Sequence, residues 1–215
     1  MKMPISKAEV YEDLRRRIII NELEPLKSLS EKDLMRHYGI GRTPLREILL
    51  ELQRDGLIQR FPRTGTLVSP MDLHLFRQVV EIRTQLEGFA SELAADRITD
   101  DQLDAMQNVL RRVAEFQGAD SHDLGLLMQC EIDFHNLIYE ASHNRKMRDI
   151  LYELHGISAR FWCYLIFGKQ AIFNQFEDHQ RLLEALRKRD RKAARQIAVD
   201  HVQKFVNQVK DHVLI

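Results

Sequence analysis

The sequence predicts a mainly α-helical protein, with an N-terminal winged helix-turn-helix domain followed by a C-terminal all-α antiparallel helical bundle. Three observations predict this fold class. Two short helical patterns flank the tight turn Gly39-Ile40-Gly41. Two short β-prone runs then surround the sequence Pro-Arg-Thr-Gly, which is typical of a hairpin turn. Beyond Pro70 there is neither proline nor a strand pattern, and apolar residues recur with the 3.6-residue period of helices.

A first helix is predicted from about residue 6 to residue 21. Ser6 and Glu9 have the spacing of a capping box, in which each side chain bonds to the backbone N–H of the other residue. Apolar residues then recur at helical spacing: Val10, Leu14, Ile18 and Ile19. One face of this helix is therefore expected to pack against the elements that follow.

The next two helices form the helix-turn-helix itself. The first begins at Ser30 and ends at Gly39. The second begins at Thr43 and Pro44, because proline is favoured in the first turn of a helix, and it ends before Gly56. The residues of this second helix that are expected to face inward are Leu45, Ile48, Leu49 and Leu52.

The β-prone runs at residues 57–61 and 66–69 are predicted to pair as the wing. Ser69-Pro70 then marks the expected boundary between a DNA-binding domain, residues 1–70, and a second domain, residues 71–215. Helices in the second domain are predicted at about 72–97, 100–117, 122–141, 145–167, 171–189 and 191–213. The short loops between them indicate antiparallel neighbours, as in a helical bundle.

Composition limits the class of protein. The 215 residues have a formal net charge of zero, but the first 70 carry 13 Lys or Arg against 10 Asp or Glu, so a basic head on an acidic body is expected. No apolar run approaches 18 residues, which argues against secretion and against any membrane partner. The two cysteines, Cys130 and Cys163, are too few for a disulfide framework and indicate reduced thiols in a cytoplasmic protein.

Basic and hydroxyl side chains gather at the start of the second helix of the helix-turn-helix. Arg42, Thr43 and Arg46 fall on its exposed side, where such a helix meets base edges and phosphates in the DNA major groove. A bidentate arginine–guanine contact discriminates against a wrong base by roughly 1–3 kcal/mol. Further cations on neighbouring elements are placed to reach the DNA: Lys32, Arg60 and Arg63. The alternative is a solvated basic face on an ordinary helical hairpin.

Three histidines and a carboxylate in the second domain are expected to meet in its core. Glu131 and His135 are four residues apart, so they share one helix face, and that face is otherwise apolar. His179 and His201 also have apolar neighbours, and each lies eleven residues from the expected turn at Asp190. In an antiparallel hairpin both then lie roughly 16 Å from the turn, at the same level. Such an N₃O set suits Zn²⁺, Ni²⁺ or Mn²⁺, and the alternative is a hydrogen-bonded network without metal.

Other polar residues are not expected in this set. Asp133 is two residues from His135, which places it roughly 200° around the helix. The remaining six histidines are expected at the surface or in loops: His37, His74, His122, His143, His155 and His212.

The segment GIGRTPLREILLELQRDGLIQR, followed by PRTGTLV, closely resembles the DNA-binding motif of the GntR family of bacterial transcription regulators. The resemblance implies operator contacts from the positions that match in this chain: Lys32, Arg42, Thr43, Arg46 and the wing-tip Gly65. The chain departs from the family pattern at two places. It has Leu26 after Pro25 where the family usually has Gly, and Gly41 where the family usually has Ser.

The second domain resembles the FCD effector domain found in the FadR-type subfamily of GntR regulators. The resemblance lies in EIRTQLEGFAS, EIDFHNLIYEASHN and DHQRLLEALRKRDRKAARQIAVDHV. Metal-binding members have a carboxylate four residues before a histidine and two later histidines about 22 residues apart, which matches Glu131, His135, His179 and His201. The family carboxylate is normally Asp, whereas this chain has Glu. Arg83 resembles a family arginine near the effector pocket; its alternative role is a surface salt bridge with Glu87 four residues on.

The leading hypothesis is a dimeric bacterial transcription regulator. The homodimer would bind double-stranded operator DNA of pseudo-palindromic sequence, with an affinity set by a small carboxylate effector bound at or near a divalent metal ion. One alternative is a metal-dependent helical-bundle enzyme, but no second ligand set for a di-metal pair and no general base are recognisable, so no catalytic residue is assigned. Another is a regulator whose metal is structural or is itself the signal. The residues do not distinguish repression from activation.

Overall fold

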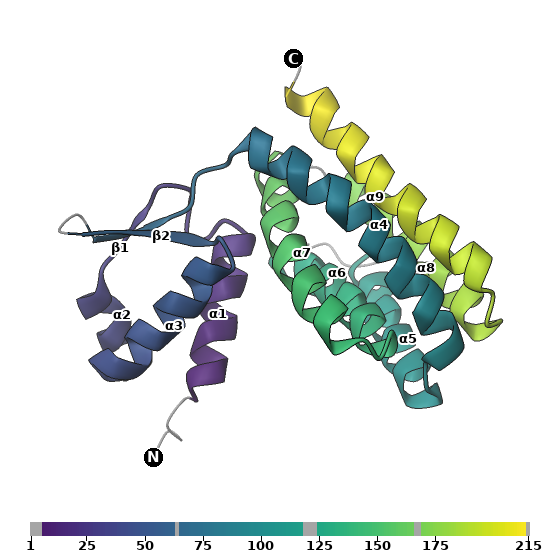
Figure 1. Cartoon of the computed structure of the whole chain (residues 1–215), viewed down its shortest axis with the longest axis horizontal. Helices are drawn as coiled ribbons and strands as arrows, with labels where there is room; N and C mark the ends of the chain where they lie inside the picture. The colour runs from purple at the N-terminus through teal and green to yellow at the C-terminus, as the bar shows by residue number, and fades with distance from the viewer. Residues whose placement is uncertain (1–5, 63–64, 118–123, 166–168, 214–215) are drawn as a thin grey trace.

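A computed structural model of the chain has a small N-terminal head, the elements from Lys7 to Val68, and a larger helical body, from Leu73 to Val213 (Figure 1). The structure describes residues 6–62, 65–117, 124–165 and 169–213. Nine α-helices and three short strands are found in these ranges, which confirms the mainly α class that the sequence predicts. Among the described helices, none has the length and apolar character that a bilayer crossing requires.

The head has the expected winged helix-turn-helix order. Its elements are α1 (Lys7–Ile19), β1 (Ser28–Leu29), α2 (Glu31–Tyr38), α3 (Arg42–Arg54), β2 (Ile58–Phe61) and β3 (Gly65–Val68). The capping box of α1 is confirmed, since Ser6 and Glu9 each accept a hydrogen bond from the other's backbone N–H. Helix α2 ends at Gly39, whose φ of 65° lies in the left-handed region that glycine adopts without a Cβ clash.

The wing has one more strand than the sequence predicts. Strands β2 and β3 pair antiparallel as expected, and β1 pairs with the other edge of β3, which gives the order β1-β3-β2. The segment that contains β1, residues 23–29, includes Pro25 and is predicted from the sequence to form a turn. A two-residue strand has no alternation to detect, and its hydrogen-bond partner lies far along the chain.

The core of the head is formed by the inward faces of α1 and α3, as their apolar spacing predicts. The fully buried side chains on these two helices include Val10, Leu14, Ile18, Ile19, Leu45, Ile48, Leu49 and Leu52. Burial of this face of α3 leaves the opposite side of the helix free, and Arg42, Thr43 and Arg46 are exposed there. Packing therefore orients the basic side of α3 toward solvent.

The body consists of six helices, close to the predicted ranges. They are α4 (Leu73–Arg97), α5 (Asp100–Gln117), α6 (Leu124–Ala141), α7 (Arg145–Leu165), α8 (Lys169–Arg187) and α9 (Arg191–Val213). Helices α4 and α9 run side by side along one edge of the body, and α7 lies on the side that faces the head (Figure 1). The core between these helices is apolar, except for one buried cluster of histidines and carboxylates.

Head and body meet where α1 contacts α7. The guanidinium of Arg15 is buried, lies 3.7 Å above the ring of Tyr152 and donates a hydrogen bond of 2.9 Å to the carbonyl oxygen of Tyr152. Gly156 allows this approach, because a Cβ at that position would lie 2.8 Å from Arg15 Nη2. Arg160 donates a hydrogen bond of 2.6 Å to the carbonyl oxygen of Ser69, at the end of the head. Helix α7 is therefore the part of the body most directly attached to the head.

Candidate functional site

The first turns of α3 present a basic surface. Arg42, Thr43 and Arg46 are exposed, and no acidic residue lies in the first turn of the helix. The N-terminus of an α-helix carries a partial positive charge, which adds to the attraction for phosphate. Gly41 is the N-cap of α3 and makes no side-chain cap hydrogen bond. Because Gly41 has no side chain, the N-cap residue does not bond to the free backbone N–H groups at the start of α3.

Glu31 connects the other parts of the candidate DNA-binding face. Its carboxylate lies 4.0 Å from Arg46 Nε on α3 and 3.4 Å from Arg60 Nη2 on β2. Lys32, the next residue, is exposed at the start of α2. A groove between α2 and the wing is lined by Glu31, Arg60, Phe61, Pro62, Gly65 and Thr66.

The structure thus brings six of the seven residues predicted to contact DNA to the helix-turn-helix and its wing. Gly65 begins β3 with a φ of 108° and is exposed in the groove. Arg63, the seventh, lies outside the described residues. Glu31 was not predicted from the sequence, because an acidic residue gives no signal for DNA binding on its own.

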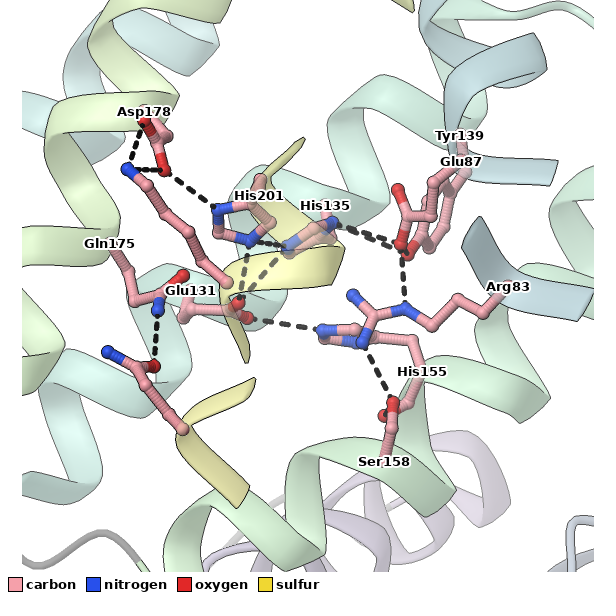
Figure 2. Close-up of polar contacts among 12 residues, drawn as sticks. Arg83, Glu87, Glu131, His135, Tyr139, His155, Ser158, Gln175, Asp178 and His201 are labelled. Carbon is pink, nitrogen blue, oxygen red and sulfur yellow. Dashed lines mark hydrogen bonds and ion pairs between the residues drawn. The ribbon is translucent and has the colours of Figure 1, made fainter. Parts of the chain in front are cut away.

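The four predicted metal ligands come together in the body. In Figure 2, dashed lines join Glu131 to His135, His155 and His201, and His135 and His201 lie side by side. Glu131 Oε1 lies 3.0 Å from His135 Nε2 and 3.9 Å from His201 Nε2, and the two imidazole nitrogens are 3.3 Å apart. One ligand atom from each of Glu131, His135, His179 and His201 lies within 4.8 Å of the others. The helices α6, α8 and α9 therefore converge on one point, as the register of the sequence predicts.

His179 provides the test of whether this set fits a metal ion. Its side chain is buried, and neither ring nitrogen has a hydrogen-bond partner in the part of the chain that the structure describes. Nδ1 of His201 also has none. An unpartnered polar atom in a protein core costs roughly 1–3 kcal/mol, and an imidazole nitrogen aimed at a carboxylate and two other imidazoles is a good ligand for a borderline divalent ion. The donor chemistry of these four residues fits such an ion.

The buried carboxylate of Glu87 contacts Nδ1 of His135, whereas Glu131 contacts Nε2. Glu87 Oε1 accepts hydrogen bonds from Arg83 Nε at 2.8 Å and from the Tyr139 hydroxyl at 2.5 Å, and it lies 3.4 Å from His135 Nδ1 (Figure 2). The arrangement of imidazole and carboxylate is the one that commonly orients a metal-binding histidine. The alternative role predicted for Arg83 is a surface salt bridge with Glu87, and the predicted surface location is wrong. The ion pair is present, but both side chains are at least 96% buried.

His155 also belongs to this cluster, so the expectation that it lies at the surface or in a loop is wrong. It is on α7, its side chain is buried, and its Nε2 lies 3.2 Å from Glu131 Oε2. Its ring centroid is 4.5 Å from that of His135. The sequence provided no spacing signal for His155, because it comes from a helix that contributes none of the other histidines.

Asp178 stands behind His201 in a similar way. It is buried beside His201, with its Oδ2 3.9 Å from His201 Nδ1, and it accepts hydrogen bonds from Lys204 at 2.7 and 2.9 Å. Asp133, by contrast, bonds to Gln129 and lies 3.4 Å from Arg112, away from the cluster. Asp133 therefore lies apart from the four candidate ligands, as its position on the helix predicts.

A small cavity lies beside the cluster. Its polar lining comprises Arg83, Glu131, His155, Gln175 and His201, and its apolar lining comprises Met128, Ala159, Trp162, Val202 and Phe205. The cavity volume is about 20 Å³, whereas one water molecule needs roughly 10–15 Å³ on the same measure. The structure thus places Arg83 in the same cavity as two of the candidate metal ligands. Two N–H groups of Arg83 already bond to Glu87 and to Ser158 Oγ, the latter at 2.8 Å.

The charges of the cluster are strongly coupled. Burial opposes ionisation of Glu131, but the neighbouring His135 and His155 outweigh it and hold the pKa of Glu131 well below its usual range. Burial also disfavours a charged His135, yet Glu131 and Glu87 raise the pKa of His135 to about 9. Burial and the nearby Arg83 lower the pKa of His155 to about 4. Burial opposes ionisation of Glu87 too, but His135 and Arg83 hold its pKa below the usual range. Glu131 and Glu87 are therefore ionised at neutral pH, and His155 is neutral.

Sequence profiles match this chain over most of its length. A profile of the FCD domain matches residues 78–204. A profile described as "Bacterial regulatory proteins, gntR family" matches residues 6–68. The two matches cover the body and the head, respectively.

Similar proteins are also regulators by name. The chain is 25% identical over 210 residues to the uncharacterized HTH-type transcriptional regulator YdhC of Bacillus subtilis, covering 96% of this chain and 91% of that protein. It is 26% identical over 205 residues to the HTH-type transcriptional repressor RspR of Escherichia coli, covering 94% and 88%, respectively. Among solved structures, McbR/YncC of Escherichia coli matches with a TM-score of 0.85 at 23% identity, covering 96% of this chain and 98% of that one.

Proposed function

The chain belongs to the GntR family of bacterial transcription regulators and carries an FCD effector domain, and on this basis we propose how its DNA binding is controlled. It is a regulator rather than an enzyme, as its similar proteins are by name. In the proposed function a homodimer binds a pseudo-palindromic operator through α3 and the wing. A small organic acid, bound beside a divalent metal ion in the body, changes the affinity for that operator.

The observation that best supports the metal ion is the convergence of four donors in the core, where both ring nitrogens of His179 lack a hydrogen-bond partner among the described residues. Glu131, His135, His179 and His201 would hold the ion, and His179 has no other hydrogen-bond partner to explain its position in the core. A divalent ion supplies two positive charges and a Lewis acid to this site. Zn²⁺, Ni²⁺ and Mn²⁺ all suit three imidazoles and one carboxylate.

The charge of the surrounding groups supports an anionic effector. Arg83 is positive, Glu87 and Glu131 are negative, and histidines that bind a metal do so as neutral imidazoles. The buried Asp178 forms a salt bridge with Lys204, so this pair adds no net charge. With a divalent ion this buried group has a net charge of +1. A monocarboxylate beside Arg83 restores neutrality, which is the condition for a stable buried charge cluster.

The size of the cavity supports a coupled conformational change. A volume of about 20 Å³ admits roughly one water molecule, so an organic acid must displace side chains of the lining. The side chains that would have to move include Trp162 on α7 and Phe205 on α9, which line the cavity. A ligand that fits one arrangement better than another shifts the equilibrium by the difference in its binding free energies. An effector that separates α7 from α9 would therefore move α7, the helix to which the head is attached.

The exposed face of α4 supports self-association. Leu75, Ile82 and Phe89 follow one another at intervals of seven residues and are 39%, 53% and 42% exposed. The exposed residues Gln78 and Gln85 lie between them on the same face and carry no charge. A two-fold dimer buries the same surface on both copies, so an uncharged apolar stripe fits a second copy of this helix.

Replacement of Ile82 by Asp is expected to convert the dimer into a monomer. Two aspartates would face each other near the two-fold axis, and like charges in an interface cost several kcal/mol, which is a loss of more than about 100-fold in dimer affinity. Sedimentation equilibrium measures this directly. Ile150→Asp is the matched control, because Ile150 is 48% exposed on α7 and lies outside the stripe. A dimer of unchanged affinity with Ile82→Asp would show that the interface lies elsewhere.

The proposed function is tested on operator DNA. Genomic fragments retained by the purified protein define the operator, which is expected to contain two inverted half-sites. The operator is then titrated with protein treated with a chelator, with added zinc, and with zinc plus individual small monocarboxylates. At least one acid is expected to change the operator affinity about fivefold or more, and only when zinc is present. A change with zinc alone would make the metal itself the signal. If zinc binds but changes nothing with any acid, its role is structural.

A further inference from the structure

His155 is the one histidine of the cluster that the ligand set does not include. Its ring is buried on α7, its Nε2 faces Glu131 Oε2 at 3.2 Å, and no described residue bonds to its Nδ1. The helix turn that carries it also contacts α1 of the head. We propose that His155 is a positioning residue, which holds Glu131 in its metal-binding orientation and links the metal site to the DNA-binding head. This inference rests on the proposed function of the metal site.

The two oxygens of Glu131 have different neighbours. Oε1 faces the ligand set, at 3.0 Å from His135 Nε2 and 3.9 Å from His201 Nε2. Oε2 faces away from it, toward His155. A glutamate has one more rotatable bond than an aspartate, so a partner on its second oxygen is needed to fix the carboxylate. His155 makes that contact.

The contact also defines the tautomer of His155. A carboxylate oxygen only accepts hydrogen bonds, so the neutral imidazole must carry its proton on Nε2 and donate it to Glu131. With that proton in place, Nε2 has no lone pair for a metal ion. His155 is thus distinct in role from the three histidines of the ligand set, although it lies among them.

The same turn of α7 faces the head. Tyr152 and Gly156 lie roughly 60° and 100° around the helix from His155, and both contact the buried guanidinium of Arg15 on α1. Ala159, one turn further, is buried in the apolar core of the head. On α6, Ile132 is the neighbour of Glu131 and is buried in that same core. Both partners of the Glu131–His155 hydrogen bond are therefore directly beside residues that hold the head.

Few residues therefore separate Glu131 from α1, and a shift of Glu131 can move α1 through them. The hydrogen bond between Glu131 and His155 sets the separation of α6 and α7 at this level, and the head packs across both helices. Metal binding through Glu131 stabilises one separation. That separation of α6 and α7 favours one orientation of the head on the body. The head orientation in turn sets the distance between the two α3 helices of a dimer.

Zinc affinity of the purified full-length protein tests the positioning role. His155→Phe keeps the ring but removes the donor, and it is expected to weaken zinc binding about 10- to 100-fold, the usual effect of losing a partner of a metal ligand. His155→Gln places an amide N–H near the position of Nε2 and is expected to restore most of the affinity. His155→Asn has the same amide one methylene shorter and is expected to behave like the Phe variant. Competition with a chromogenic chelator provides the affinities, and His212→Gln, at an exposed position, is the control.

Operator affinity tests the link to the head. The zinc-dependent change is measured between chelated protein and protein with zinc plus the small monocarboxylate that gives the largest change in the operator titration of the wild type. Arg15→Met removes the guanidinium from α7 but keeps much of its length. This variant is expected to bind zinc as the wild type does, while the zinc-dependent change in operator affinity falls to less than about half of the wild-type fold-change. Circular dichroism and thermal melting confirm that each variant is folded before it is compared.

The outcomes separate the inference from the function on which it rests. If the wild type binds no zinc, both the proposed metal site and this inference fail. If the wild type binds zinc and His155→Phe or His155→Asn binds it equally well, the metal site stands and the positioning role is overturned. If Arg15→Met retains the full zinc-dependent change in operator affinity, the link through α7 is overturned.

Discussion

Arg42→Ala and Arg46→Ala are each expected to abolish specific operator binding while the protein remains a folded dimer. Both side chains are exposed on the first turns of α3, and neither contributes to the core of the head. Arg46 has one ionic neighbour, Glu31 at 4.0 Å, and an exposed pair at that distance contributes little to stability. A bidentate contact to guanine accounts for about 1–3 kcal/mol, or roughly 5- to 150-fold in affinity, before the loss of phosphate attraction is added.

Gel-shift titration at one fixed salt concentration measures this loss, with a scrambled operator to define non-specific binding. Arg77→Ala is the matched control, because it removes one exposed arginine from α4 of the body and leaves the head unchanged. The control is expected to bind within about twofold of the wild type. Operator affinity retained by either α3 variant would contradict the assignment of this helix as the one that contacts bases.

His179→Ala is expected to eliminate stoichiometric metal binding. His179 is one of four candidate donors, and its imidazole has no hydrogen-bond partner among the described residues. With zinc at a thousand times its dissociation constant, metal binding stabilises the wild type by about 4 kcal/mol. For a chain of this size that corresponds to about 8–16 °C in melting temperature. The variant is expected to lose this increment together with the metal.

Elemental analysis of the purified variant and melting curves with and without zinc measure the two effects. His212→Ala, an exposed position outside the cluster, controls for the loss of one histidine. Wild-type metal stoichiometry in His179→Ala would exclude His179 as a ligand.

His179→Leu adds a second, opposite test of the same residue. In the presence of a chelator it is expected to melt above the wild type, because it removes two buried unpartnered nitrogens that cost roughly 1–3 kcal/mol. A chelated His179→Leu protein that melts below the wild type would indicate that His179 stabilises the core in some other way.

Most of the fold could be predicted because its signals are local. Capping residues such as Ser6, the glycine at the end of α2 and the apolar period of each helix all depend on neighbours within one or two turns. The pairing of Glu131 with His135 follows from helix geometry in the same way. The level of His179 and His201 follows from their equal distance to one turn. Strand β1 was missed because its only partner is far away in sequence.

The residues around the candidate metal ligands could not be predicted because their signals are not local. Glu87 lies on α4 and His155 on α7, and nothing in their own helices distinguishes them from surface residues with helical neighbours. An Arg and a Glu four residues apart predict an exposed pair, and only the packing of α4 against α6 and α7 buries it. The same packing brings His155 to Glu131.

The sequence by itself determined the order of the helices, the basic start of α3 and the four residues of the candidate metal set. Each of these depends on spacing along one helix or one hairpin, which the chain specifies directly. Only the tertiary structure decided which side chains stand behind those ligands and which helix joins them to the head. These contacts depend on how helices cross, and the crossing is set by the summed packing of many side chains rather than by any short motif.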